Sequence, residues 1–149
     1  ATVTANSSGV IATDGVLTVS NSIVAGNDAD DCAGIVASGG GNVLGSSCDD
    51  GDGDIADTSD PQLGALTDNG GPTPTHLPST GSPAIDVADS TLVADQRGAT
   101  RPVDGDGNGS AVADAGSVEA GGVVVDPATP PLPTTDPAAP VVADPTFTG

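Results

Sequence analysis

The sequence lacks nearly all of the large aromatic and sulfur-containing side chains that build thick protein cores. Its 149 residues include no Trp, Tyr or Met, and one Phe. Apolar volume must therefore come from Val, Ile, Leu and Ala, set among 22 Gly. Small β-branched side chains pack well on pleated strands, so the composition favours a thin, stacked all-β core. A chain of this length is expected to form a single domain.

Positive charge is almost absent as well. Arg97 and Arg101 are the two basic residues and there is no Lys, against 21 acidic residues and a net charge of −19. Nucleic acids and anionic membranes attract proteins through cationic side chains, so neither is expected as a partner. The acidic surplus has two open interpretations, a solvated and salt-adapted surface or clustered carboxylates that collect divalent cations.

Long apolar runs are missing too. No stretch of about 18 apolar residues exists, so no membrane insertion is expected. The chain opens at Ala1 without a leader, which predicts a processed, secreted or cell-surface protein. Cys32 and Cys48 fit an oxidising compartment, where one disulfide would close a loop of about 15 residues and contribute about 3 kcal/mol. Two free buried thiols are the alternative.

Apolar residues recur with a fixed spacing in the first part of the chain. Val3, Ile23, Val43 and Leu63 follow one another at steps of 20 residues. Short runs of strand formers surround them, separated by Gly, Asn and Asp. A period near 20 indicates a solenoid whose turns bury their apolar residues against each other, so these four side chains are expected along one inner line. No window carries a helical apolar stripe, and almost no helix is expected.

Four later segments, in this order, carry a family resemblance: DPQLGALTDNGGPTPTH, GSPAIDVAD, DQRGATRPVDGDGNG and VADAGSVE. Together with LTVSNSIVAGN and GGGNVLGSSC before them, they resemble choice-of-anchor Q domain proteins, which are secreted and have the pectin-lyase-like fold. The resemblance covers roughly residues 17–119. It implies an all-β fold, a short right-handed parallel β-helix (solenoid) with a C-terminal cap and an extended Pro-rich tail. The family commonly has Cys and an aromatic residue where this chain has Ala113 and Val118.

The predicted organisation is therefore in three parts: β-helix rungs with an acidic loop over 1–94, a capping segment over 95–121 and an extended Pro/Val-rich tail over 122–149. Members of the resembled family are mostly uncharacterised surface proteins. The resemblance thus implies a fold and a location rather than a reaction.

The run Asp-Gly-Asp-Gly-Asn-Gly at 104–109 places oxygen ligands at alternate positions and Gly at the sixth, as in an EF-hand-type calcium loop. The acid expected at the twelfth position is missing, since Ala115 stands there. Asp114 or Glu119 could substitute, and a tight acidic turn pinned by an arginine is the alternative interpretation. The candidate Ca²⁺ ligands are Asp104, Asp106, Asn108 and Asp114, with a second, similar site at Asp50, Asp52 and Asp54.

The remaining polar candidates are interpreted as structural. Arg97 and Arg101 are expected to form structural ion pairs, because a guanidinium can bridge carboxylates or cap strand carbonyls. The single histidine, His76, is expected to be a hydrogen-bonding residue without a metal or catalytic role.

The tail carries seven of the 13 prolines and a near-repeat of VVVDP and PVVADP. Its Val runs are strand candidates that could pair with exposed strand edges of a neighbouring copy and form a head-to-tail homopolymer. The predicted assembly residues are Val123, Val124, Val125, Val141 and Val142.

Three functions compete. The favoured one is a non-catalytic extracellular structural protein, a subunit of a self-assembling surface filament. The second is a calcium-dependent adhesin that binds a glycan or another cell-surface ligand. The third is a polysaccharide lyase or hydrolase, which the missing Lys and the missing Trp and Tyr platforms argue against. The chain is therefore predicted not to be an enzyme.

Overall fold

The computed structural model describes residues 1–124, and residues 125–149 lie outside the described part. Within residues 1–124 the chain forms five strands and no helix. The strands are β1 (Thr2–Val3), β2 (Val10–Val19), β3 (Ile23–Val24), β4 (Cys32–Ser38) and β5 (Val43–Leu44). The chain after β5 consists of turns and single bridges as far as it is described.

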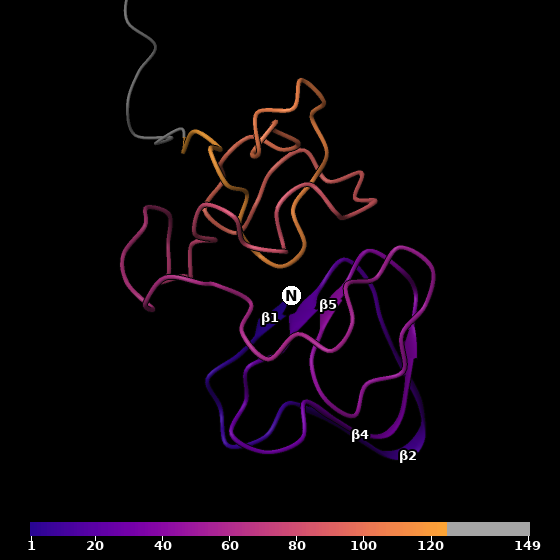
Figure 1. Ribbon diagram of the computed structural model, residues 1–149. Coiled ribbons are helices and arrows are strands. Elements are labelled where there is room, and N and C mark those ends of the chain that lie inside the picture. The colour runs from indigo at the N-terminus through magenta and orange to yellow at the C-terminus, as the bar shows by residue number, and fades with distance from the viewer. Residues whose placement is uncertain (125–149) are drawn as a thin grey trace, which may run out of the picture.

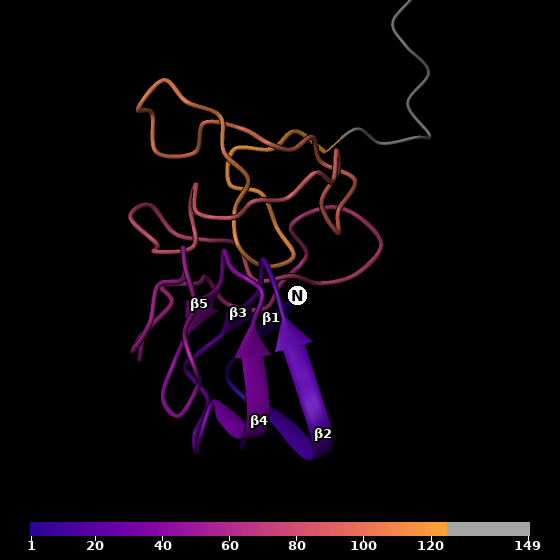
Figure 2. The same ribbon diagram turned by 90° about the vertical axis from the view of Figure 1, so that its right-hand side faces the viewer.

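The strands form two parallel sheets between which the chain alternates. β1, β3 and β5 pair in that order in one sheet, and β2 pairs with β4 in the other. Parallel neighbours cannot be joined by a tight hairpin, so the chain visits the other sheet between successive strands. β1, β3 and β5 lie between the β2–β4 sheet and the C-terminal segment, which gives three layers (Figures 1 and 2).

The three-stranded sheet is buried on both faces. Ile23 and Val43 pair in register and point into one hydrophobic cluster, whereas Val24 and Leu44 point into a second. Successive residues of a strand face opposite sides, so strands of two residues can supply both clusters. The first cluster is completed by Ala25, Ala84 and Ala115, and the second by Cys32 and Val36 of β4.

The predicted right-handed parallel β-helix is wrong for this chain, because the described residues form two short parallel sheets and no closed solenoid. The reason lies after β5. Val43 takes Ile55 as its next parallel neighbour through a single bridge, beyond a loop rich in Asp and Gly. All later bridges up to residue 124 are antiparallel, so the parallel stacking does not continue around a coil in this part of the chain.

The predicted inner line of Val3, Ile23, Val43 and Leu63 is wrong as well. Ile23 and Val43 do stack, but the partner of Val3 is Val24, one residue out of the expected register. A shift of one residue turns a side chain to the opposite face of a sheet. Leu63 packs beside the first cluster while its backbone bridges a later segment in the antiparallel sense.

The β2–β4 pair contains a bulge that glycine makes possible. The ladder shifts between Ile11 and Val16, so residues 12–15 of β2 lie opposite Gly34 alone. Gly34 has a φ of +79°, and a Cβ there would lie 2.0 Å from the carbonyl oxygen of Ala12. No other residue fits this approach without moving the backbone.

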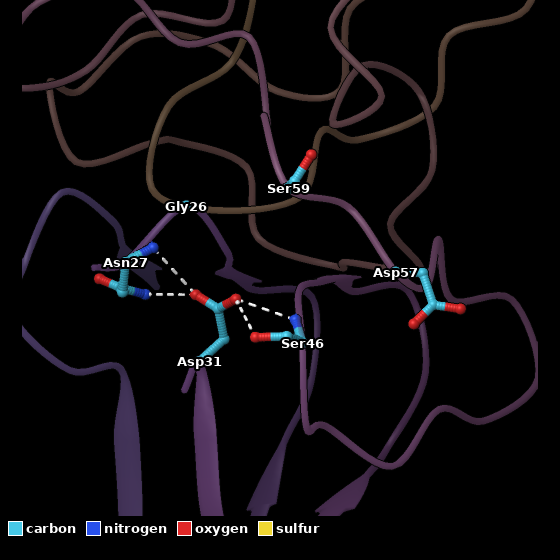
Figure 3. Close-up of a pocket in the computed structure, with 6 residues that line it drawn as sticks. All are labelled: Gly26, Asn27, Asp31, Ser46, Asp57 and Ser59. Carbon is cyan, nitrogen blue, oxygen red and sulfur yellow. Dashed lines mark hydrogen bonds between the residues drawn. The ribbon is translucent and has the colours of Figure 1, made fainter. Parts of the chain in front are cut away.

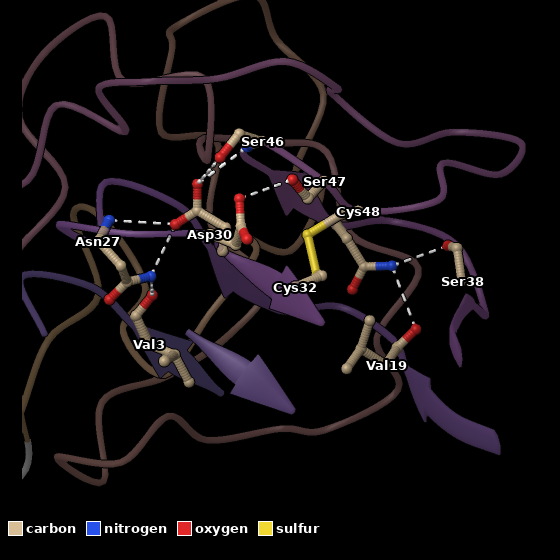
Figure 4. Close-up of a disulfide and its surroundings, with 11 residues drawn as sticks. Val3, Val19, Asn27, Asp30, Cys32, Ser38, Ser46, Ser47 and Cys48 are labelled. Carbon is tan, nitrogen blue, oxygen red and sulfur yellow. Dashed lines mark hydrogen bonds between the residues drawn. A yellow bond between two sulfur atoms is a disulfide. The ribbon is translucent and has the colours of Figure 1, made fainter. Parts of the chain in front are cut away.

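The predicted disulfide between Cys32 and Cys48 is present, with Cα atoms 4.9 Å apart (Figure 4). It fastens the loop after β5 to the start of β4, and both cysteines contribute to the second cluster. Beside it, the Ser47 hydroxyl donates to Asp30 Oδ1 at 2.9 Å. The crosslink therefore ties together two turns that are separated along the chain.

The C-terminal segment, 60–124, covers the first cluster without regular strands. Ala115 N donates to the Ala84 carbonyl at 2.8 Å, and both alanines are fully buried against β3 and β5. Prolines interrupt this segment repeatedly, and each removes a backbone donor that a ladder would need. Side-chain carboxylates satisfy many of its backbone N–H groups instead.

Candidate functional site

Three carboxylates converge in the C-terminal segment: Asp86, Asp104 and Asp106. One oxygen of each lies within 4.8 Å of the other two, and the first two side chains are half-buried while the third is exposed. Among the described residues, no other group of three or more His, Cys, Asp or Glu side chains has its potential ligand atoms this close together. Carboxylate oxygens are the ligands that hard divalent cations prefer.

The backbone of Asp86 brings it into this group. Its φ of +58° lies in the left-handed region, which is uncommon for a residue other than glycine. Its N–H donates to Asp114 Oδ1 at 2.9 Å, and its Oδ2 accepts the N–H groups of Gly105 and Asp106 at 3.1 and 2.9 Å. Such a conformation costs about 1–3 kcal/mol and persists only where its surroundings fix it. These bonds hold the carboxylate of Asp86 against the 104–109 loop.

The loop closes around its own first carboxylate. Asp104 Oδ1 accepts the N–H groups of Gly107 and Asn108 at 2.8 and 3.1 Å, and Oδ2 accepts that of Gly109 at 2.8 Å. These bonds explain why a Gly-rich acidic run folds into a compact turn, since the side chain replaces a missing backbone partner for each amide.

Asn108, one of the predicted ligands, does not direct its side-chain oxygen to the group. Its Oδ1 accepts the N–H of Ser110 at 2.9 Å, and its Nδ2 donates to Asp106 Oδ2 at 2.9 Å. The structure thus brings together Asp104 and Asp106 from the predicted set, with Asp86 as the third member.

Asp114, the fourth predicted ligand, lies behind Asp86 and is fully buried. Its two oxygens accept the N–H groups of Asp86 and Ala120. Burial raises the pKa of Asp114 to about 6; the two N–H bonds oppose this rise, and the negative charges of Glu119 and Asp86 add to it. Asp114 therefore supports the backbone of the site from inside and does not face the ion position.

Glu119 belongs to the same region of the C-terminal segment. It is fully buried, and its Oε2 accepts Arg101 Nε at 2.8 Å and Asp114 N at 3.1 Å. Its Oε1 accepts Val103 N at 2.7 Å, one residue before the acidic loop begins. Arg101 Nη2 also donates to the carbonyl of Asp114 at 2.7 Å. One buried ion pair thereby links both ends of the segment that carries the loop.

Arg97 forms the second buried ion pair. Its Nε donates to Asp95 Oδ2 at 2.9 Å, and its Nη2 donates to the carbonyl of Glu119 at 2.7 Å. Burial opposes ionisation of Asp95, but hydrogen bonds from Glu119, Arg97 and Ala99 outweigh it and lower its pKa. Both arginines are therefore paired with carboxylates outside the Asp86–Asp104–Asp106 group.

The second predicted calcium site is not assembled. Asp50 and Asp52 are exposed, whereas Asp54 turns inward, where its Oδ1 accepts Asn42 N at 2.8 Å and its Oδ2 accepts Gly51 N at 2.9 Å. Burial raises the pKa of Asp54, but hydrogen bonds from Ser38, Asn42 and Gly51 more than offset this, so its pKa is lowered. Its carboxylate accepts hydrogen bonds from the fully buried Asn42 at the turn before β5.

A cavity of about 190 Å³ near β3 contains another buried acid, Asp31 (Figure 3). Asp31 Oδ1 accepts the backbone N–H and Nδ2 of Asn27 at 3.0 and 2.7 Å. Its Oδ2 accepts the backbone N–H of Ser46 at 2.9 Å and the Ser46 hydroxyl at 3.3 Å. Asp31 therefore joins two successive turns, and it does not belong to a group of three potential metal ligands among the described residues.

Of the predicted assembly residues, the structure describes Val123 and Val124. Val124 forms an antiparallel bridge with Ala99 of its own chain, and the carbonyl of Val123 accepts Thr100 N at 3.3 Å. Val125, Val141 and Val142 lie outside the described residues. His76 Nδ1 lies 2.7 Å from the carbonyl of Gly64, a backbone contact of the kind expected.

Comparisons with family models, with curated proteins and with solved structures find no match for this chain. The resemblance to choice-of-anchor Q domain proteins therefore stays a prediction. No helix among residues 1–124 is long and apolar enough to cross a membrane. The Cys32–Cys48 disulfide is compatible with an extracellular protein, since such bonds persist in oxidising compartments.

Sequence reasoning missed Asp86. No spacing rule connects it to the 104–109 loop, because the two meet only through the fold. The available signal was its setting, an acid between the apolar residues Ile85 and Val87. An acid in such a run is costly to bury unless its carboxylate has partners.

Proposed function

We propose that this chain is a non-catalytic extracellular structural protein whose C-terminal segment is stabilised by a bound Ca²⁺ ion. The observation that carries the proposal is the convergence of Asp86, Asp104 and Asp106 within 4.8 Å. A structural ion at this position would join the 104–109 loop to the segment that covers the first cluster. The disulfide supports the extracellular part of the proposal.

The charge balance at the group favours a cation. Three carboxylates with oxygens within 4.8 Å of one another repel each other, and neither arginine is paired with them. Calcium accepts irregular oxygen coordination of six to eight ligands, so carboxylates, backbone carbonyls and water can share the shell. Magnesium demands near-ideal octahedral geometry and gives up its water reluctantly, and it is expected to bind more weakly here.

The test is thermal unfolding of the full chain in chelator and in millimolar CaCl₂. A ligand bound only by the folded form at about 100 times its Kd adds about 2.7 kcal/mol. For a domain of this size that corresponds to a rise in Tm on the order of 10 °C. Because the chain has no Trp or Tyr, far-ultraviolet circular dichroism or calorimetry is the suitable readout.

The matched variants are Asp106→Asn, which removes one exposed ligand, and Asp14→Asn, which makes the same charge change on exposed β2. Asp106→Asn should lose most of the calcium-dependent rise in Tm, while Asp14→Asn should keep it. An unchanged Tm between chelator and calcium in the unmodified chain would reject the proposal.

Self-association is a second candidate function, and an open strand edge favours it. β2 pairs with β4 on one side, and no strand among residues 1–124 covers its other side. Unpaired edges of this kind join other chains unless something blocks them. The charge of −19 opposes association, and its reach falls from about 10 Å at 0.1 M salt to about 3 Å at 1 M. Sedimentation at both salt concentrations tests it, with association expected at the higher one.

A further inference from the structure

The open edge of β2 presents unpaired backbone groups in a regular run. The carbonyl of Val19 accepts Gly39 N at 2.7 Å on the side of β4. In a parallel ladder every second residue of a strand directs its N–H and C=O groups to the same neighbouring strand. Leu17 and Val19 therefore face β4, and the N–H and C=O groups of Val16 and Thr18 face the open side. In Figure 2, β2 lies at the outer side of the pair it forms with β4. The run 16–19 follows the bulge and is in regular register with β4.

The outer face of the same pair of strands is apolar. Ile11, Val16 and Ile35 are 58%, 64% and 59% exposed, and Val16 lies directly opposite Ile35. Asp14, within the bulge, is the one charged residue in β2 and β4. Edge strands are usually protected by charges, by Pro or by bulges. Here the bulge and the charge sit before residue 16, and the run 16–19 has neither.

We propose that this edge forms a two-fold interface with a second copy of the chain, in which the runs 16–19 pair antiparallel and extend the β2–β4 sheet into the partner. The inference rests on the self-association proposed above and identifies its surface. The outward-directed residues set the register. Val16 exchanges backbone hydrogen bonds with Thr18 of the partner subunit, and Leu17 lies on the two-fold axis.

A second copy is the occupant that the charge distribution favours. Two molecules of charge −19 repel each other, and they can approach most closely through the run 16–19, which has no acidic side chain. A two-fold interface also needs a surface that is complementary to itself. Two identical strand edges that pair antiparallel meet this requirement. The pairing closes on itself, so it yields a dimer and not a growing filament.

The short length of the paired run determines how strong this dimer can be. Edge pairing joins the two sheets side by side, so the run 16–19 of each copy makes the contact while Ile11 and Ile35 stay exposed. Stable interfaces bury about 800 Å² on each partner. The dimer is therefore weak, and it forms at high protein concentration and high salt.

Equilibrium sedimentation of the full chain in about 1 M NaCl tests the interface with three variants. Val16→Glu introduces a charge into the paired run, and Thr18→Pro removes an N–H directed to the open edge, where the monomer makes no use of it. Val93→Glu is the control, since Val93 is 80% exposed and lies in the C-terminal segment. Circular dichroism verifies that each variant is folded.

The two β2 variants should weaken dimerisation by about tenfold or more, while Val93→Glu dimerises like the unmodified chain. If the chain associates and neither β2 variant weakens it, the interface is wrong although self-association stands. If that association instead grows into open polymers, a head-to-tail contact is indicated. If the unmodified chain stays monomeric at every salt and protein concentration, both the interface and self-association are rejected.

Discussion

Replacing Glu119 by Gln should remove most of the stability of the fold, although the two side chains have nearly the same shape. Glu119 is 0% exposed and accepts hydrogen bonds from Arg101, Val103 and Asp114 at 2.8, 2.7 and 3.1 Å. A Gln amide offers one oxygen and one NH₂ group. Whichever way it turns, the NH₂ group faces a donor that the carboxylate had satisfied.

Two costs then add. A buried donor left without an acceptor costs about 1–3 kcal/mol. The guanidinium of Arg101, 7% exposed, also loses its counter-charge, and removing one partner of a buried ion pair typically costs about 3–5 kcal/mol in total. Domains are stable by about 5–15 kcal/mol, so Glu119→Gln should leave a fold that is marginal at 25 °C.

The assay is urea unfolding followed by far-ultraviolet circular dichroism, with Asp14→Asn as the control for an equal change in net charge. Asp14 is exposed, and its replacement should change the free energy of unfolding by less than about 0.5 kcal/mol. A loss of less than about 1 kcal/mol for Glu119→Gln would refute the reasoning.

A double-mutant cycle with Arg101→Gln separates the ion pair from the other bonds of Glu119. Residues in one hydrogen-bond network show coupling energies of about 0.5–3 kcal/mol. The double variant should therefore lose less stability than the sum of the single variants. Strict additivity would show that the ion pair does not stabilise the C-terminal segment in the way its geometry indicates.

Two further predictions concern pH and redox state. Asp114 has a pKa raised from 3.8 to about 6, so the folded form holds its proton more tightly than the unfolded form, and stability should fall by up to about 3 kcal/mol as pH rises from about 4 to about 6. Asp54 and Asp95 have lowered pKa values, so their ionised forms stabilise the fold above about pH 4. This stabilisation is lost as the pH falls below about 4. Urea midpoints across this range should show both trends, and an equally steep fall between pH 4 and 6 in Asp114→Asn would exclude Asp114 as its source. Reduction of the Cys32–Cys48 bond should lower stability by about 3 kcal/mol, measured as Tm with and without reductant. The paired replacement Cys32→Ala with Cys48→Ala should make Tm insensitive to reductant, and an equal response to reductant in that variant would exclude the disulfide as the cause.

Some features followed from the sequence alone because they depend on counts or on neighbouring residues. With two cysteines in the chain, a single intramolecular pairing exists, and the structure has it. The 104–109 run forms a tight acidic turn because Asp and Gly alternate, so each carboxylate can reach the amides a few residues ahead. The short runs of strand formers at residues 23–24 and 43–44 favour extended structure for an equally local reason, and they form β3 and β5.

Tertiary structure alone decided the rest. A regular spacing of apolar residues predicted a closed solenoid, but spacing does not determine register, and a shift of one residue places Val3 on the other face from Ile23. Asp86 joins Asp104 and Asp106 because a left-handed backbone and the buried Asp114 hold it there, and neither can be read from local sequence. Glu119 and Arg101 are ordinary charged residues in the sequence. The fold makes them a buried pair by enclosing both inside the C-terminal segment, where little water can reach either partner.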